Sequence, residues 1–166
     1  PGVIRYRFWP RRLRRLDLFY TALSIPLAWA ILHWYFFIVN PELPTHWPMP
    51  QPRTSEGLWR LFVGINAVGI WDELFFVNTV FALLRSCFSF RVANLAQAVV
   101  YGSVLTDMAF TGIGPIVVFI FALTQGFMFE KGENLLYVLI VHLIVDAFLV
   151  AAILAYHYPG YTPGWL

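Results

Sequence analysis

The sequence predicts an all-α fold, a polytopic transmembrane helix bundle of about five spans. The chain of 166 residues is 60% hydrophobic and only 12% charged, whereas soluble domains are about half apolar and about a quarter charged. Its mean hydropathy is +0.68, and its apolar residues form runs near the ~20 residues that a helix needs to cross a bilayer. These observations exclude a disordered chain, a collagen and an ordinary soluble enzyme, and the single Cys87 excludes a disulfide scaffold.

Several apolar runs are long enough to be membrane helices. The predicted spans are residues 16–39, 57–84, 92–110, 113–129 and 135–156. The first follows an arginine-rich segment, as in a signal peptide, but it is too long for one and no small-residue cleavage site follows, so we expect a retained anchor. Gly112, Gly114 and Pro115 make the boundary between the third and fourth spans the least well defined.

These spans divide the chain into three parts. We expect residues 1–15 to form a basic cytoplasmic arm and residues 16–156 to form a single transmembrane helical domain. Residues 157–166 contain Tyr158, Tyr161 and Trp165 and are expected to form an interfacial tail, because such aromatic side chains favour the headgroup region.

Basic residues predict the orientation of the bundle. Six arginines precede the first span, and the turn between Arg85 and Arg91 and the loop at Lys131 would lie on the same side. The positive-inside rule therefore predicts a cytoplasmic N-terminus and an external C-terminus, in a bacterial inner or plasma membrane. The arm directly precedes a span, so we expect it to contact the lipid bilayer and its anionic lipids rather than nucleic acid, with about 1 kcal/mol from each arginine near the surface.

Four ionisable residues lie at membrane depth. Asp72 and Glu73 lie about 16–18 Å from the cytoplasmic end of the second span, and His142 lies about 14 Å from that end of the fifth, at a rise of about 1.5 Å per residue. Asp146 lies one turn further in. Each such group costs about 2.5–3.5 kcal/mol at a helix centre, so it is expected to have a partner or a function.

The helix period predicts which of these groups meet. Asn66, Glu73 and Val77 share one face within about 20°, and Asp72 points about 100° away. His142 and Asp146 form an i, i+4 pair. The third span presents a mildly polar stripe of Asn94, Gln97, Tyr101 and Leu105. A bundle that brings these three faces together would enclose a small polar cavity.

Two interpretations of this cluster remain open. In the functional one, Glu73 is a general base or a ligand, His142 lies opposite it and Asp146 orients the imidazole. In the structural one, the same residues form a buried polar cluster that holds the helices together.

Two motifs resemble those of the CPBP family of intramembrane metalloproteases, the CAAX proteases and bacteriocin-processing (Abi) proteins. Residues 71–78 read WDELFFVN, and their Asp72 and Glu73 match the acids of the family motif EExxxR. Residues 142–146 read HLIVD and match HxxxN or HxxxD. The middle motif, FxxxH, falls within residues 97–105. The resemblance covers roughly residues 57–156 and implies the bundle fold of that family.

The resemblance also implies a chemistry. The family uses a glutamate that activates water and histidines that bind a metal or stabilise an oxyanion. Applied to the matching positions of this chain, the resemblance implies that Glu73, Asp72, His142 and Asp146 are catalytic residues. It also implies that His142 and Glu73 are ligands of a divalent metal such as zinc. The family arginine falls on Val77 and the middle histidine on Leu105, however, so the resemblance implies a divergent member whose active site is partly lost.

We therefore expect an accessory or scaffold subunit of a membrane complex. The chain contains 16 Phe, 8 Tyr and 7 Trp, which exceeds what the spans need internally, so lipid or other membrane protein subunits must cover them. Two alternatives belong to other classes. One is an active glutamate-dependent intramembrane endopeptidase of the CAAX or bacteriocin-processing type. The other is a proton or ion relay through Asp72, Glu73, His142 and Asp146.

Overall fold

The computed structural model describes residues 4, 14–47, 49, 54–108 and 110–158. Within these residues every regular element is helical. The elements are α1 (Arg15–Trp34), η1 (Tyr35–Val39), η2 (Leu43–His46), α2 (Ser55–Asp72), η3 (Glu73–Phe81), α3 (Ala82–Cys87), α4 (Phe90–Met108), α5 (Gly114–Gly132) and α6 (Leu135–His157). The predicted all-α bundle is confirmed, and its helices begin and end close to the predicted spans. Most of the predicted arm and tail lies outside the described residues.

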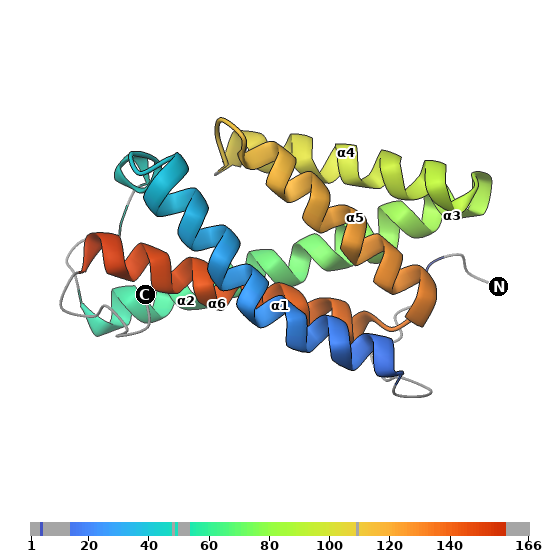
Figure 1. The fold of residues 1–166 in the computed structure, drawn as a ribbon, viewed down its shortest axis with the longest axis horizontal. Coiled ribbons are helices and arrows are strands. Elements are labelled where there is room, and N and C mark those ends of the chain that lie inside the picture. The colour runs from blue at the N-terminus through green and yellow to red at the C-terminus, as the bar shows by residue number, and fades with distance from the viewer. Residues whose placement is uncertain (1–3, 5–13, 48, 50–53, 109, 159–166) are drawn as a thin grey trace.

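Four helical segments are long and apolar enough to cross a membrane, namely Arg15–Val39, Ser55–Cys87, Gly114–Gly132 and Leu135–His157. The chain is therefore an integral membrane protein. The third predicted span, α4, has 19 residues but is not among these four, because Arg91, Asn94, Gln97 and Asp107 make it less apolar. It nevertheless runs beside α5 along the bundle (Figure 1).

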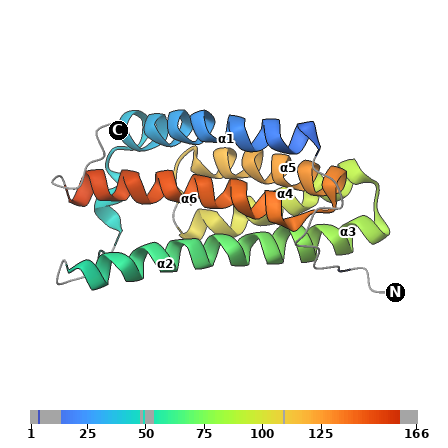
Figure 2. The ribbon, with the colours of Figure 1, turned by 90° about the horizontal axis from the view of Figure 1, so that it is seen from below.

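Helix α6 has the most apolar composition of the four segments and lies at the centre of the bundle. Figure 2 shows it between α1 on one side and the continuous helix formed by α2, η3 and α3 on the other. Half of its span is buried, a larger share than in any of the other three. Residues near the middle of α6 are therefore surrounded by other parts of the protein.

Two apolar clusters form the core. One contains Tyr35 and Phe36 of η1 with Ala152 of α6. The other contains Phe76 of η3 and Tyr101 of α4, whose rings stack at a centroid distance of 4.4 Å. Close helix approaches surround the second cluster, as is typical of membrane bundles: a Cβ on Gly126 of α5 would overlap the amide of Asn94 on α4.

The long second helix changes its winding where the candidate site begins. Residues Glu73–Phe81 form a π-helix of nine residues, whose hydrogen bonds span five residues instead of four. This winding turns both Val77 and Asn78 inward together with Glu73, and all three are fully buried. The burial of Asn78 does not follow from the period of an ideal α-helix.

Candidate functional site

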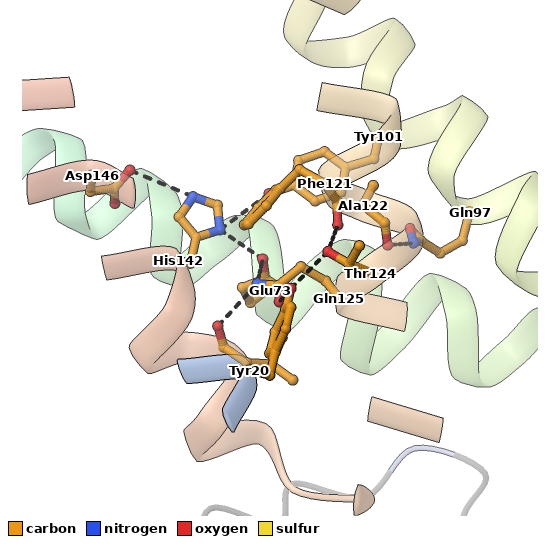
Figure 3. Close-up of polar contacts among 11 residues, drawn as sticks. Tyr20, Glu73, Gln97, Tyr101, Phe121, Ala122, Thr124, Gln125, His142 and Asp146 are labelled. Atoms are coloured by element: carbon orange, nitrogen blue, oxygen red, sulfur yellow. Dashed lines mark hydrogen bonds and ion pairs between the residues drawn. The ribbon is translucent and has the colours of Figure 1, made fainter. Parts of the chain in front are cut away.

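Glu73 and His142 are in direct contact in the interior. Glu73 is the first residue of η3 and is fully buried. Its Oε1 lies 2.7 Å from Nδ1 of His142, which projects from the middle of α6 (Figure 3). The structure thus places an acid of the second span against an imidazole of the last one, at the depth where the sequence placed both.

His142 also has partners on its other sides. Its Nε2 lies 3.6 Å from Oδ1 of Asp146, one turn along α6, and the hydroxyl of Tyr101 on α4 lies 3.3 Å from its Nδ1. The ring of Phe121 packs edge-on against the imidazole at 5.4 Å. Gly69 of α2 makes room for this arrangement, because a Cβ there would overlap the Asp146 carboxylate and lie 2.7 Å from Cδ2 of His142.

Three carboxylates lie in this region with oxygen atoms that remain unpaired. Asp72 is buried like Glu73, although the helix period predicted that the two side chains would point in different directions. Asp72 Oδ1, Glu73 Oε2 and Asp146 Oδ2 have no hydrogen-bond partner among the described residues. Burying a polar atom without a partner is costly. Such atoms are therefore where a ligand or water molecule would bind most favourably.

Gln125 of α5 also belongs to the site, although the sequence did not predict this role. Its Nε2 donates to Glu73 Oε1 at 2.9 Å and to the Val138 carbonyl at 3.0 Å. The hydroxyl of Tyr20 on α1 donates to Gln125 Oε1 at 3.1 Å and lies 2.7 Å from Thr124 Oγ1 (Figure 3). The available signal was a glutamine within an otherwise apolar span, which indicates a buried polar partner without identifying it.

Other predicted polar residues lie outside this network. Asn94 and Gln97 donate to the carbonyls of Leu123 and Ala122, at 3.0 and 2.9 Å, and so join α4 to α5. Asn66 donates to the Phe62 carbonyl within its own helix at 2.8 Å. Of the polar stripe predicted for the third span, Tyr101 alone contacts the Glu73–His142 pair among the described contacts.

The two motif positions that depart from the resemblance are apolar in the structure. Val77 is fully buried, and Leu105 packs against the cluster of Phe76 and Tyr101. Neither position supplies a cation or an imidazole to Glu73. Of the histidines whose side chains are described, His142 is the one that contacts this acid, whereas His33 stacks between Trp29 and Phe37.

The described residues do not fit a metal centre. A zinc site needs at least three protein ligands, and the described part of the chain holds no group of three or more His, Cys, Asp or Glu side chains placed to bind one ion. The predicted ligands Glu73 and His142 contact each other directly. What the pair offers chemically is a carboxylate next to an imidazole, an arrangement suited to proton transfer.

Comparison with known protein families identifies the family of the chain. Residues 54–148 match the model of the type II CAAX prenyl endopeptidase Rce1-like family, which is more than half of the chain. The chain belongs to this family. The resemblance inferred from the two motifs is therefore confirmed. No curated protein and no solved structure matches the chain.

The matched segment contains most of the candidate site. It extends from the start of α2 to Phe148 of α6 and includes Glu73, Gln125 and His142. Helix α1, which contributes Tyr20, lies outside it. The matched segment thus contains the acid and the imidazole, and the preceding helix α1 contacts the site through Gln125.

Proposed function

We propose that this chain is a non-proteolytic member of the CAAX prenyl endopeptidase family that serves as an accessory or scaffold subunit of a membrane complex. One observation supports this most: the Glu73 carboxylate is fully buried, and its Oε1 interacts with His142 and Gln125 inside the bundle. A water-activating acid needs a substrate and a water molecule beside it. The apolar Val77 and Leu105 leave only one imidazole at this acid among the described residues.

A cleavage assay in proteoliposomes tests the absence of proteolysis. The substrate is a prenylated peptide ending in a CAAX sequence, and the products are identified by mass spectrometry. We expect the parent, E73Q and H142A to give the same background. The matched control is S103A, because Ser103 is exposed and bonds only within α4.

Cleavage by the parent that is lost in E73Q and kept in S103A would contradict the proposal. It would support the second candidate, a glutamate-dependent intramembrane endopeptidase. A specific observation favours that candidate: Glu73 Oε2 has no partner among the described residues, while His142 lies 2.7 Å from the other oxygen.

The scaffold role predicts stable association with other membrane subunits. Many large apolar side chains face outward, among them Trp29, Trp59 and Trp71. Native mass spectrometry in mild detergent is expected to detect a complex of fixed stoichiometry. A stable monomer at all detergent concentrations would contradict this role.

A proton or ion relay has less support. Polar contacts connect Asp146, His142, Glu73, Gln125 and Tyr20. Asn66 and Gln97, which would have to extend the path, are hydrogen-bonded elsewhere. Liposomes containing the protein are expected to show no more proton flux than empty ones.

A further inference from the structure

The side-chain amide of Gln125 forms hydrogen bonds with residues of three helical elements. Its side chain is fully buried on α5. It donates to Glu73 of η3 and to the Val138 carbonyl of α6, and it accepts from Tyr20 of α1 (Figure 3). Both N–H groups and the oxygen of this amide therefore have a partner.

These contacts allow only one orientation of the amide. The Val138 carbonyl can only accept a hydrogen bond, so it must face the Nε2 group, which lies 3.0 Å away. Turning the amide over would place two carbonyl oxygens against each other. The second N–H of Gln125 is consequently directed at Glu73, whether the carboxyl group of Glu73 is ionised or protonated.

From this geometry we infer that Gln125 is the positioning residue of Glu73. Together with His142 it holds Oε1, at 2.9 and 2.7 Å, so the carboxylate cannot rotate without losing both contacts. Oε2 is then the atom directed away from both partners, and it has no partner of its own among the described residues.

Gln125 is also the donor that this chain provides where the motif cation is missing. Val77 brings no charge or hydrogen bond to Glu73, although it is buried on the same inward-facing winding of η3. The neutral amide reaches the acid from a different helix. Because Tyr20 in turn contacts the amide, the position of α1 is linked to the position of the Glu73 carboxylate.

This inference goes beyond the proposed function, because it concerns the orientation of Glu73 and does not depend on whether the chain cleaves peptides. It is tested on the full chain in lipid nanodiscs, with ¹⁵N-labelled histidine rings observed by NMR. The His142 signals are assigned by their loss in H142Q. In Q125L, which keeps the approximate side-chain volume but removes the donor, these signals are expected to shift in the direction seen in E73Q.

Q97L is the matched control. Gln97 is as fully buried as Gln125 and donates to the Ala122 carbonyl at 2.9 Å, but it has no contact with Glu73. Loss of the Gln97 amide is expected to lower the stability of the protein while leaving the chemical shifts of the His142 ring unchanged. Signals of Q125L that coincide with those of the parent would overturn the inference, because a merely structural glutamine would behave like Gln97.

A second measurement is made on the unaltered chain. Dipolar recoupling in the unaltered chain between the side-chain ¹⁵N of glutamine and the carboxyl ¹³C of glutamate is expected to report a pair within about 4 Å. The same signal is expected to be absent in E73Q. If the unaltered chain shows no such pair, Gln125 does not position Glu73.

Discussion

At the residue scale, the site is a set of buried polar groups in which some atoms are paired and others are not. Glu73 Oε1 has two partners, whereas Glu73 Oε2 and Asp72 Oδ1 have none among the described residues. Removing one member of such a pair leaves the other buried and unpaired, which costs more than the hydrogen bond itself contributes. Substitutions in the site are therefore expected to affect stability as well as chemistry.

Tyr101 gives a prediction at this scale. Tyr101→Phe removes the hydroxyl that lies 3.3 Å from His142 Nδ1 but keeps the ring stacked on Phe76. The free energy of unfolding is expected to fall by about 1 kcal/mol, the usual contribution of one hydrogen bond. Denaturant titration in detergent measures it.

The control for this prediction is Tyr156→Phe, because Tyr156 is exposed. That substitution is expected to change the free energy of unfolding by less than about 0.5 kcal/mol. Equal effects of the two substitutions would mean that the Tyr101 hydroxyl has no specific partner in the site.

At the element scale, the close contact of α2 with α6 depends on a small residue. Gly69 lies one turn before the site and faces His142 and Asp146. Its substitution by alanine would displace both side chains or push the two helices apart. The matched control is Gly64→Ala on the same helix, since a Cβ there meets nothing within 4 Å.

We expect Gly69→Ala to destabilise the protein by about 1–3 kcal/mol, as overpacking does. Gly64→Ala is expected to be neutral or to stabilise by up to about 1 kcal/mol, because alanine favours the helix. Thermal unfolding of both variants in the same detergent measures the difference. A Gly69→Ala variant as stable as Gly64→Ala would show that α2 and α6 do not approach closely at this point.

At the element scale, some features of the site could be predicted from the sequence and others could not. The depth of Glu73 and His142 follows from counting residues along two apolar spans, and direct contact between them agrees with that count. The burial of Asn78 does not follow, because it depends on the π-helical winding of η3. Asn66 was placed on the face of Glu73 from ideal helix geometry, yet it bonds within its own helix.

The role of Gln125 could not be predicted for a different reason. A single glutamine in an apolar span indicates only that some partner exists. Its partners come from η3, α6 and α1, and which helices meet there depends on packing of the whole bundle. The pattern of apolar residues and its helical period predict a helix and which residues share a face. They do not predict which other helices pack against that face.

At the scale of the whole molecule, ion pairs and a further arginine contact join three helices at one end of the bundle. The start of α1, the end of α3 and the end of α5 lie at the same end (Figure 2). Arg14 pairs with Asp17 at 3.0 Å and donates to the Lys131 carbonyl, and Arg85 pairs with Glu130 at 2.9 Å. These contacts connect α1, α3 and α5 where the positive-inside rule predicts the cytoplasm.

The orientation is testable through Cys87, which is free and exposed at that end. A membrane-impermeant maleimide is expected to label it in inside-out vesicles and not in right-side-out vesicles. The control carries Thr45→Cys with Cys87→Ser, because Thr45 is exposed in η2 at the opposite end. It is expected to show the reverse pattern. Labelling of Cys87 from the external side would contradict the predicted topology.

The central feature of the site is the contact between Glu73 and His142, and a double-mutant cycle with Glu73→Leu and His142→Leu measures it directly. Each single substitution leaves the other side chain buried without this partner and is expected to cost about 3–5 kcal/mol in unfolding free energy. The double variant is expected to cost less than the sum of the two, with a coupling energy of about 1–3 kcal/mol. Costs that simply add would mean that the two side chains do not interact, and that the acid is not held inside the bundle by the imidazole.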